Sequence, residues 1–309
     1  MPPSPKSASK AAAPTGAERQ RPLPRLNPAM ACDTAFRIVA GRYLRDLTAS
    51  HEATCTGDPG ALHQMRIALT RLRTAILLFS PMVDDSRRTH FRAELKWLNS
   101  QLGTVRDLDV AMERLEAIDQ QPSPAADYLR SWEDKRADSH RQLARALRSP
   151  RYRRLVQGIS GWIEHGPWSI GKGKRGAEMR ASPIAAFGTA KLREWRKKLL
   201  KESRKLPKMN AGKRHKLRLL NKKLSYSVES FDDLFADKRF SGQRAALKQL
   251  RKAQKSLGQL NDDANAHSLA AALHRDGVHP PLQFLSPKRE KRLLKTASSA
   301  YRKLAALKG

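Results

Sequence analysis

The sequence predicts an all-α protein of two antiparallel helical bundles, and three observations lead to this fold class. Apolar residues recur with the 3.6-residue period of a helix along most of the chain after residue 28, while no segment alternates convincingly as a strand. Proline and glycine interrupt that period at intervals typical of helix lengths. A helical motif near residue 63 also occurs a second time near residue 215.

The motif helices, residues 62–73 and 214–226, each have one apolar face. At about 100° per residue, apolar side chains three and four positions apart share a face. That face must be buried against other helices, so both motif helices are expected to contribute to the core. Its members are Met65, Leu69, Leu72, Ile76 and Phe79 in the first helix and Leu217, Leu220, Leu224, Val228 and Phe231 in the second.

Beside the apolar face, each motif helix carries a stripe of polar and basic side chains at matching offsets. The first stripe consists of His63, Arg66, Thr70 and Arg73. The second stripe consists of His215, Arg218, Lys222 and Ser225. Each helix is therefore expected to present hydrogen-bond donors and positive charge next to its packing face.

The repeat extends beyond the motif helices. His63 and His215 are 215 − 63 = 152 residues apart, and Gly103 and Gly258 are 258 − 103 = 155 residues apart. The corresponding pairs include Arg66 with Arg218, Arg71 with Lys223, Lys96 with Arg251, and Asp107 with Asp262. Two such units packed face to face would be related by a pseudo-twofold axis and would bring both basic stripes to one central groove.

The helical pattern and its interruptions predict the elements in chain order. Asp58 and Pro59 form a start signal, because Asp can cap free backbone N–H groups and Pro suits the first helical position. Gly103 and Gly258 are expected to permit close helix crossing or a break. The expected helices span about 30–53, 59–80, 86–118, 125–148, 152–165, 183–205, a segment around His215, 241–274 and 287–307.

Four segments follow from these elements. Residues 1–28 are rich in Pro, Ala, Ser and basic residues without an apolar period, which is typical of a disordered tail. Residues 29–165 form the first bundle and residues 183–309 the second. Between them, residues 166–182 are rich in glycine and basic residues, which favours a flexible linker.

The charge balance predicts a polyanionic partner. Sixty-one Lys and Arg against 29 Asp and Glu give a net charge of +32, so a compact chain would repel itself unless an anion balanced it. Nucleic acid, an anionic membrane and polyphosphate all fit. No apolar run approaches the roughly 20 residues of a membrane span, no signal peptide is evident, and Cys32 and Cys55 are too few for a disulfide framework. We therefore expect a cytoplasmic protein.

These residues resemble the CHAD family, named for a histidine-bearing α-helical domain. The resemblance is carried by the two His-x-x-Arg helices and by Leu-Gly-x-x-Arg-Asp-x-Asp at residues 102–109, with a weaker counterpart at residues 257–262, and it covers residue 30 to the end. It implies two helical bundles around a basic central groove that binds inorganic polyphosphate, without catalysis or a cofactor. The protein would thereby be targeted to polyphosphate granules. Thr70 and Ser225 depart from the family pattern, which prefers Arg there, and Asn221 lies in a run that is usually apolar or basic.

Carried onto this chain, the resemblance points to one set of polyphosphate-binding residues. Arginine can bridge two phosphate oxygens with its planar fork, lysine acts as a point charge, and histidine donates more N–H groups when protonated. The set comprises His63, Arg66, Arg71, Arg73, His215, Arg218, Lys222 and Lys223, with Lys96, Arg106 and Arg251 as a second group. For Arg71 and Lys223, a solvated charge is an equal alternative from the pattern alone.

Two other functions stay open. The charge alone equally fits a non-specific nucleic-acid-binding protein, although aromatic residues are only 6% of the chain and do not alternate with basic ones. A phosphate-processing enzyme could use His63 or His215 as phospho-acceptor, but phosphoryl transfer usually needs carboxylate-held Mg²⁺ or a positioned base. Asp107, Asp109 and Asp262 are expected to cap helices or pair with Arg and Lys, and no metal site is predicted.

Overall fold

The structure, a computed structural model, describes residues 25–116, 126–171, 173–235, 241–275 and 284–307. Over these ranges the prediction of an all-α protein is confirmed: the β structure described is one isolated bridge between Ala31 and Pro183. The α-helices are α1 (Cys32–Ala49), α2 (His51–Cys55), α3 (Pro59–Leu78), α4 (Ser86–Glu116), α5 (Ala126–Arg148), α6 (Pro150–His165), α7 (Lys174–Ala181), α8 (Ile184–Ser203), α9 (Ala211–Ser230), α10 (Ser241–Arg275) and α11 (Pro287–Ala306). Short 3₁₀ helices are η2 (Pro167–Ser169), η3 (Leu206–Lys208) and η4 (Asp232–Phe235).

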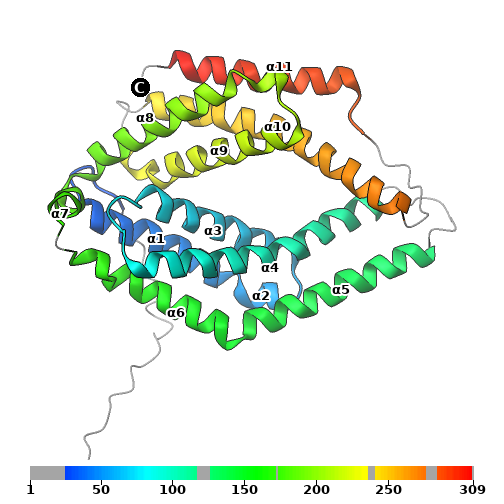
Figure 1. The fold of residues 1–309 in the computed structure, drawn as a ribbon, viewed down its shortest axis with the longest axis horizontal. Coiled ribbons are helices and arrows are strands. Elements are labelled where there is room, and N and C mark those ends of the chain that lie inside the picture. The colour runs from blue at the N-terminus through cyan, green and yellow to red at the C-terminus, as the bar shows by residue number, and fades with distance from the viewer. Residues whose placement is uncertain (1–24, 117–125, 172, 236–240, 276–283, 308–309) are drawn as a thin grey trace, which may run out of the picture.

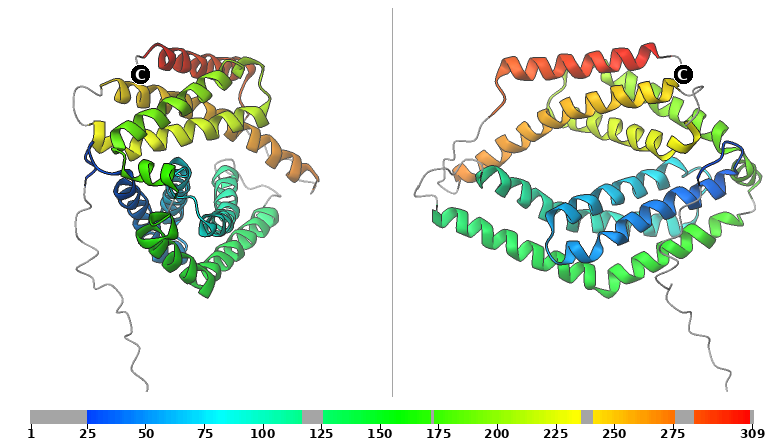
Figure 2. Two further views of the ribbon diagram at one scale, coloured as in Figure 1. Left: turned by 60° about the vertical axis from the view of Figure 1, so that its left-hand side comes forward. Right: turned by 180° about the vertical axis from the view of Figure 1, so that it is seen from behind.

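The helices form two layers that correspond to the two halves of the sequence. Figure 1 shows α8 to α11 lying above α1 to α6, with α7 beside the end at which the two layers meet. The view from behind in Figure 2 shows the same division. The two motif helices, α3 and α9, contact each other across the layers. A pseudo-twofold relation between the layers remains a prediction.

An aromatic cluster joins the two layers. Phe79, which follows α3, stacks on Phe187 of α8 at 5.4 Å between ring centroids and meets Phe231, which follows α9, edge-on at 6.1 Å. Phe36 of α1 packs against Phe79 at 5.5 Å. Phe36, Phe79 and Phe231 are fully buried, and they belong to one hydrophobic core that runs through both layers. The apolar faces of the motif helices are therefore buried, as the periodicity predicts, with Leu220 only partly so.

The start signal of α3 works as expected. The Asp58 carboxylate accepts hydrogen bonds from Gly60 N at 2.7 Å and Ala61 N at 3.2 Å, and Pro59 occupies the first helical position. Gly57 has φ +91°, a conformation that glycine adopts without steric strain, and it turns the chain from α2 into α3. This turn fixes where the first basic stripe begins.

Residues 166–171 and 173–182, in the segment expected to be a flexible linker, are described by the structure. They contain η2 and α7, and Trp168 is only 1% exposed. The Asp85 carboxylate accepts hydrogen bonds from Trp162 Nε1 at 2.9 Å and from Trp168 N at 3.1 Å, while Trp168 Nε1 donates to Trp162 O at 2.8 Å. Part of the segment thus packs against Asp85 in the first half, which its composition does not indicate, and its flexibility stays a prediction.

The end of the predicted tail also packs. Leu26 is 4% exposed and its N–H donates to Asp233 at 3.4 Å, while Pro28 O accepts from Ala185 N at 3.2 Å. Residues 1–24 of that tail lie outside the described residues. Residues 25–28 thus hold the start of the first half against the second.

Within the described residues, no helix combines the length and apolar character that a membrane crossing requires.

Gly188 of α8 offers a test of the packing around Phe231, one of the buried rings of the aromatic cluster. A Cβ atom at this position would lie 3.2 Å from Phe231 Cε2, so we expect Gly188→Val to lower the free energy of unfolding by about 1–3 kcal/mol through overpacking. Thermal denaturation followed by circular dichroism would measure the change. Gly161→Ala is the control, because a Cβ there meets nothing within 4 Å and helix propensity predicts a gain of up to about 1 kcal/mol. Equal stability of Gly188→Val and the wild type would contradict this packing.

Candidate functional site

Cations from both layers converge on Lys222. Its ammonium lies on α9, and Arg218 of the same helix together with Arg66 and Arg71 of α3 lowers its pKa. Burial is the largest cause, and the combined effect takes the pKa of Lys222 from 10.5 to about 8. The contact between α3 and α9 therefore places Arg66 and Arg71 of α3 near Arg218 and Lys222 of α9.

His63 belongs to the same group. Partial burial lowers the pKa of its imidazole, and so do Arg106, Lys222 and Arg66, whereas Glu113 raises it. We call the five basic residues and the imidazole together the first cationic cluster: His63, Arg66, Arg71, Arg106, Arg218 and Lys222. Its members come from α3, α4 and α9, so neither layer could form it alone.

Arg66 is held in place by α4. Its Nη1 donates to Leu102 O at 2.8 Å, and a Cβ on Gly103 would lie 3.4 Å from the same Nη1. Glycine at position 103 thus leaves room for the guanidinium, and α4 continues through it without a break. Burial lowers the pKa of Arg66, while Asp107 raises it. The segment at Leu102 and Gly103 therefore positions Arg66, a member of the first cationic cluster.

Lys223 forms a second group. Burial lowers its pKa first, followed by Lys198 of α8, Arg73 of α3 and Arg92 of α4. We call these four residues the second cationic cluster. Arg73 and Lys223 were predicted as site residues, whereas the sequence reasoning missed Arg92 and Lys198. Lys198 lies in the basic run of residues 193–198, whose charge looks like an ordinary solvated face until the fold sets it beside Lys223.

Arg71 is clamped at the layer contact. Its Nη2 donates to Glu229 Oε2 at 2.9 Å, and the other carboxylate oxygen accepts from Arg251 Nη2 at 3.1 Å. The Arg71 guanidinium also lies 5.3 Å from the ring centroid of Tyr226 and 6.0 Å from that of Tyr43. Of the two readings for Arg71 left open by the sequence, free solvation does not describe this side chain.

Two of the remaining predicted residues lie outside both clusters. Lys96 and His215 are exposed, and neither is among the charges that shift the pKa of Lys222 or Lys223. His215 Nδ1 lies 2.6 Å from Asn261 Oδ1. Arg106 donates to Glu113 at 2.9 Å within α4. The structure thus brings His63 and Arg106 to the first cluster, while it leaves the role of His215 and Lys96 as a prediction.

The departures from the family pattern have local partners. Thr70 Oγ1 donates to Arg66 O at 2.8 Å, and Ser225 Oγ donates to Asn221 O at 3.0 Å. Asn221 is fully buried, and its Nδ2 donates to Leu250 O and Gln254 Oε1, both at 3.0 Å. These side chains add no charge, and Asn221 instead ties α9 to α10.

Asp109 has a structural role. It is 1% exposed, and its Oδ1 accepts from Arg136 Nε at 2.8 Å and lies 2.8 Å from His140 Nε2. This confirms the expectation that Asp109 pairs with basic residues, and it fastens α5 to α4. Among the described residues, no group of three or more His, Cys, Asp and Glu side chains is arranged to hold a metal ion.

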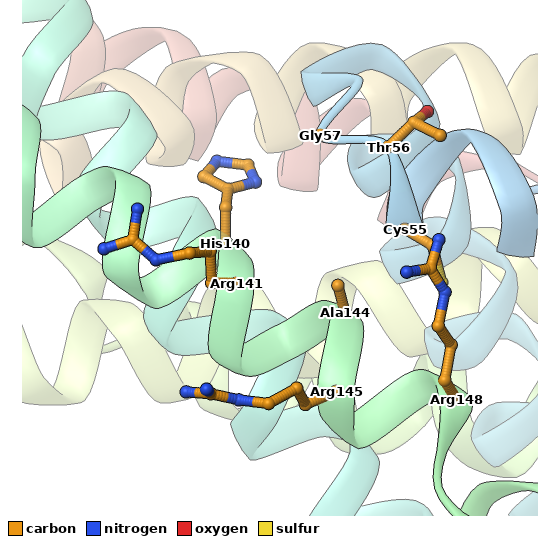
Figure 3. Close-up of a pocket in the computed structure, with 8 residues that line it drawn as sticks. All are labelled: Cys55, Thr56, Gly57, His140, Arg141, Ala144, Arg145 and Arg148. Atoms are coloured by element: carbon orange, nitrogen blue, oxygen red, sulfur yellow. The ribbon is translucent and has the colours of Figure 1, made fainter.

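A cavity of about 620 Å³ lies elsewhere, between the end of α2 and α5. Figure 3 shows Arg148 pointing toward the turn at Cys55 and Gly57, whereas Arg141 and Arg145 point away from it. Its arginines therefore do not converge, and none of the predicted site residues lines it. The two cationic clusters are the stronger candidates for a polyanion site.

Comparisons with known proteins identify the fold and the family of the chain. No curated protein matches the chain. The crystal structure of the CHAD domain from the plant Ricinus communis is similar, with 25% sequence identity and a TM-score of 0.73 over 93% of this chain and 96% of that chain. The family model of the CHAD domain matches residues 38–271, which include both cationic clusters, and the chain belongs to the CHAD domain family.

Proposed function

We propose that this protein binds inorganic polyphosphate at its two cationic clusters, and that this binding targets it to polyphosphate granules. The proposal is a binding function without catalysis. The observation that carries it is the position of Lys222, whose pKa is lowered to about 8 among arginines from both layers. Membership of the CHAD family, whose members are associated with polyphosphate, supports the same ligand.

The energetics of the first cluster favour an anionic ligand. Burial and neighbouring cations both disfavour the charged form of Lys222. Arg218 Nε is buried and has no hydrogen-bond partner among the described residues, which leaves a donor unsatisfied. A chain of phosphates would stabilise the charged form of Lys222 and accept hydrogen bonds from the guanidinium groups. An anionic ligand is therefore expected to lower the electrostatic free energy of the first cationic cluster.

Two clusters suit a linear polyanion better than a single small anion. The first cluster comprises residues of α3, α4 and α9, and the second adds Lys198 of α8. Polyphosphate has about one charge per phosphate and no base to recognise, so spaced cations are sufficient for binding. Nucleic acid would share the electrostatic attraction. Among the described residues, however, Tyr226 beside these cations is already covered by Arg71 and Lys222, and Tyr43 beside Arg71 is buried, so neither ring is open to stack on a base.

The first test is competition. Long polyphosphate should displace labelled duplex DNA and RNA from the purified protein, as measured by fluorescence anisotropy, with an affinity that falls steeply with salt. We expect Arg218→Ala to weaken polyphosphate binding by about tenfold or more, since hydrogen bonds to charged groups contribute about 1.5–3 kcal/mol. Arg153→Ala on α6 removes the same charge at an exposed position outside both clusters and should change the affinity by less than about twofold.

Failure of polyphosphate to displace the nucleic acids would favour the nucleic-acid alternative. Release of orthophosphate from polyphosphate by the protein with Mg²⁺ would instead indicate a phosphate-processing enzyme.

Lys222 predicts a pH dependence between pH 7 and 9. In the free protein its pKa is about 8, and a bound polyanion should raise this pKa, so binding takes up a proton above pH 8. The affinity for long polyphosphate should therefore fall by up to about tenfold between pH 7 and pH 9. Lys222→Arg keeps its charge throughout this range and should flatten the profile in isothermal titration calorimetry. An unchanged slope in Lys222→Arg would contradict this role.

His63 predicts a separate dependence at lower pH. Its pKa lies below 6.5 in the free protein, so the imidazole is mostly neutral at pH 7. A bound phosphate favours the protonated ring, so the affinity should rise as the pH falls from 7 toward 5.5. His63→Gln should lose this rise and leave the slope above pH 7 in place. Affinity that is independent of pH over the acidic range in the wild type would refute the placement of His63 beside the ligand.

A further inference from the structure

One carboxylate lies between two of the predicted phosphate-binding arginines. Glu229 Oε2 accepts from Arg71 Nη2 at 2.9 Å, and Glu229 Oε1 accepts from Arg251 Nη2 at 3.1 Å. The Glu229 side chain is 20% exposed and that of Arg71 is 33% exposed, whereas Arg251 is 65% exposed. The three residues come from α9, α3 and α10, so this clamp forms where the two layers meet.

The clamp adjoins the first cationic cluster. The ring of Tyr226 has the Arg71 guanidinium at 5.3 Å and the Lys222 ammonium at 5.5 Å from its centroid. Arg71 is also one of the cations that lower the pKa of Lys222. Glu229 therefore contacts Arg71, which is itself a member of the first cationic cluster.

A carboxylate and a phosphate compete for the same donors. Both accept charge-assisted hydrogen bonds from guanidinium groups at similar distances. With Glu229 in place, the group of three residues carries a net charge of +1 instead of the +2 of its arginines alone. The donors that would otherwise attract a phosphate are already directed at an internal anion.

We propose that Glu229 is an internal competitor that withholds Arg71 and Arg251 from polyphosphate, and so limits the affinity and the extent of the binding site. This inference rests on the proposed function. It assigns Glu229 as a specificity-determining residue and makes Arg71 and Arg251 weaker contributors than Arg66, Arg218 and Lys222. It also explains how so many cations can meet at the contact between the layers, because the clamp stabilises the free protein.

Thermodynamic linkage predicts two effects of the clamp on the melting temperature, one without polyphosphate and one with it. The clamp stabilises the unliganded fold, so Glu229→Gln should lower the melting temperature of the free protein by leaving Arg71 partly buried without its carboxylate. The same change leaves more to gain when an anion binds. We therefore expect a larger rise in melting temperature when polyphosphate is added to Glu229→Gln than to the wild type.

The decisive measurement is the affinity of the full chain for long polyphosphate as a function of salt. Glu229→Gln should bind about 3- to 10-fold more tightly, and its dependence of log affinity on log salt should steepen by about one, as for one added phosphate contact. The matched control is Glu94→Gln. Glu94 accepts from Arg151 of α6 with both oxygens at 2.8 Å, so this variant also removes one negative charge and one arginine pair, away from the clusters. Glu94→Gln should change neither the affinity for polyphosphate nor its dependence on salt appreciably.

Glu229→Gln that binds no more tightly than Glu94→Gln would overturn the inference, while binding by the wild type would leave the proposed function standing. A wild type that does not bind polyphosphate would instead defeat the proposed function. If Glu229→Gln does not fold, a variant of the exposed residue Arg251 provides the test. Arg251→Ala should weaken binding by less than about threefold, close to the control Arg151→Ala, because its charge is already paired. A loss of about tenfold or more would show that Arg251 contacts the ligand, and the inference would fail.

Discussion

The structure depends on the contact between the two motif helices, where a shared core is formed beside a concentration of like charge. Each fully buried Phe or Leu contributes about 1.5–3 kcal/mol, and the aromatic cluster of Phe36, Phe79 and Phe231 is one part of a core that runs through both layers. The opposing contribution is the free energy needed to keep Lys222 charged in this environment. Its pKa change from 10.5 to about 8, caused by burial first and by neighbouring cations second, corresponds to about 3–4 kcal/mol. The core therefore outweighs the repulsion, and the folded protein holds its cations together without a ligand.

Carboxylates moderate that repulsion at chosen points. Glu229 bridges Arg71 and Arg251, Glu113 pairs with Arg106, and Asp107 raises the pKa of Arg66. They leave Lys222 and Arg218 as the least compensated cations of the first cluster, and these two have the strongest reason to meet an external anion. The same pattern assigns different tasks to basic residues that the sequence presents as equivalent. Some arginines hold the layers together, and others face an incoming polyanion.

The repeat explains why one site can be made from two halves of unequal character. The first half seats Arg66 against Leu102 and Gly103, with Arg106 near His63. In the second half, Asn261 occupies the corresponding place beside His215, and nothing lies within 4 Å of a Cβ built on Gly258. The second half contributes Arg218 and Lys222 instead. The charge of the site is thus concentrated at the contact of α3 and α9, with less of it near His215.

Periodicity, capping and the repeat can be recognised along the chain alone, and they were enough to predict the helical fold class, most helix boundaries, the cap at Asp58 and the two basic stripes. It did not determine which cations meet. In the sequence, Arg92 and Lys198 look like solvated surface residues, and Glu229 looks like one more charged residue of the helix that carries Lys222. Helix packing places Arg92 and Lys198 near Lys223, and it places Glu229 against Arg71. The packing of Trp168 likewise depends on Asp85, more than 80 residues away in the chain. These features exist only in the folded chain, because the burial of a charge and the identity of its neighbours depend on contacts between distant segments.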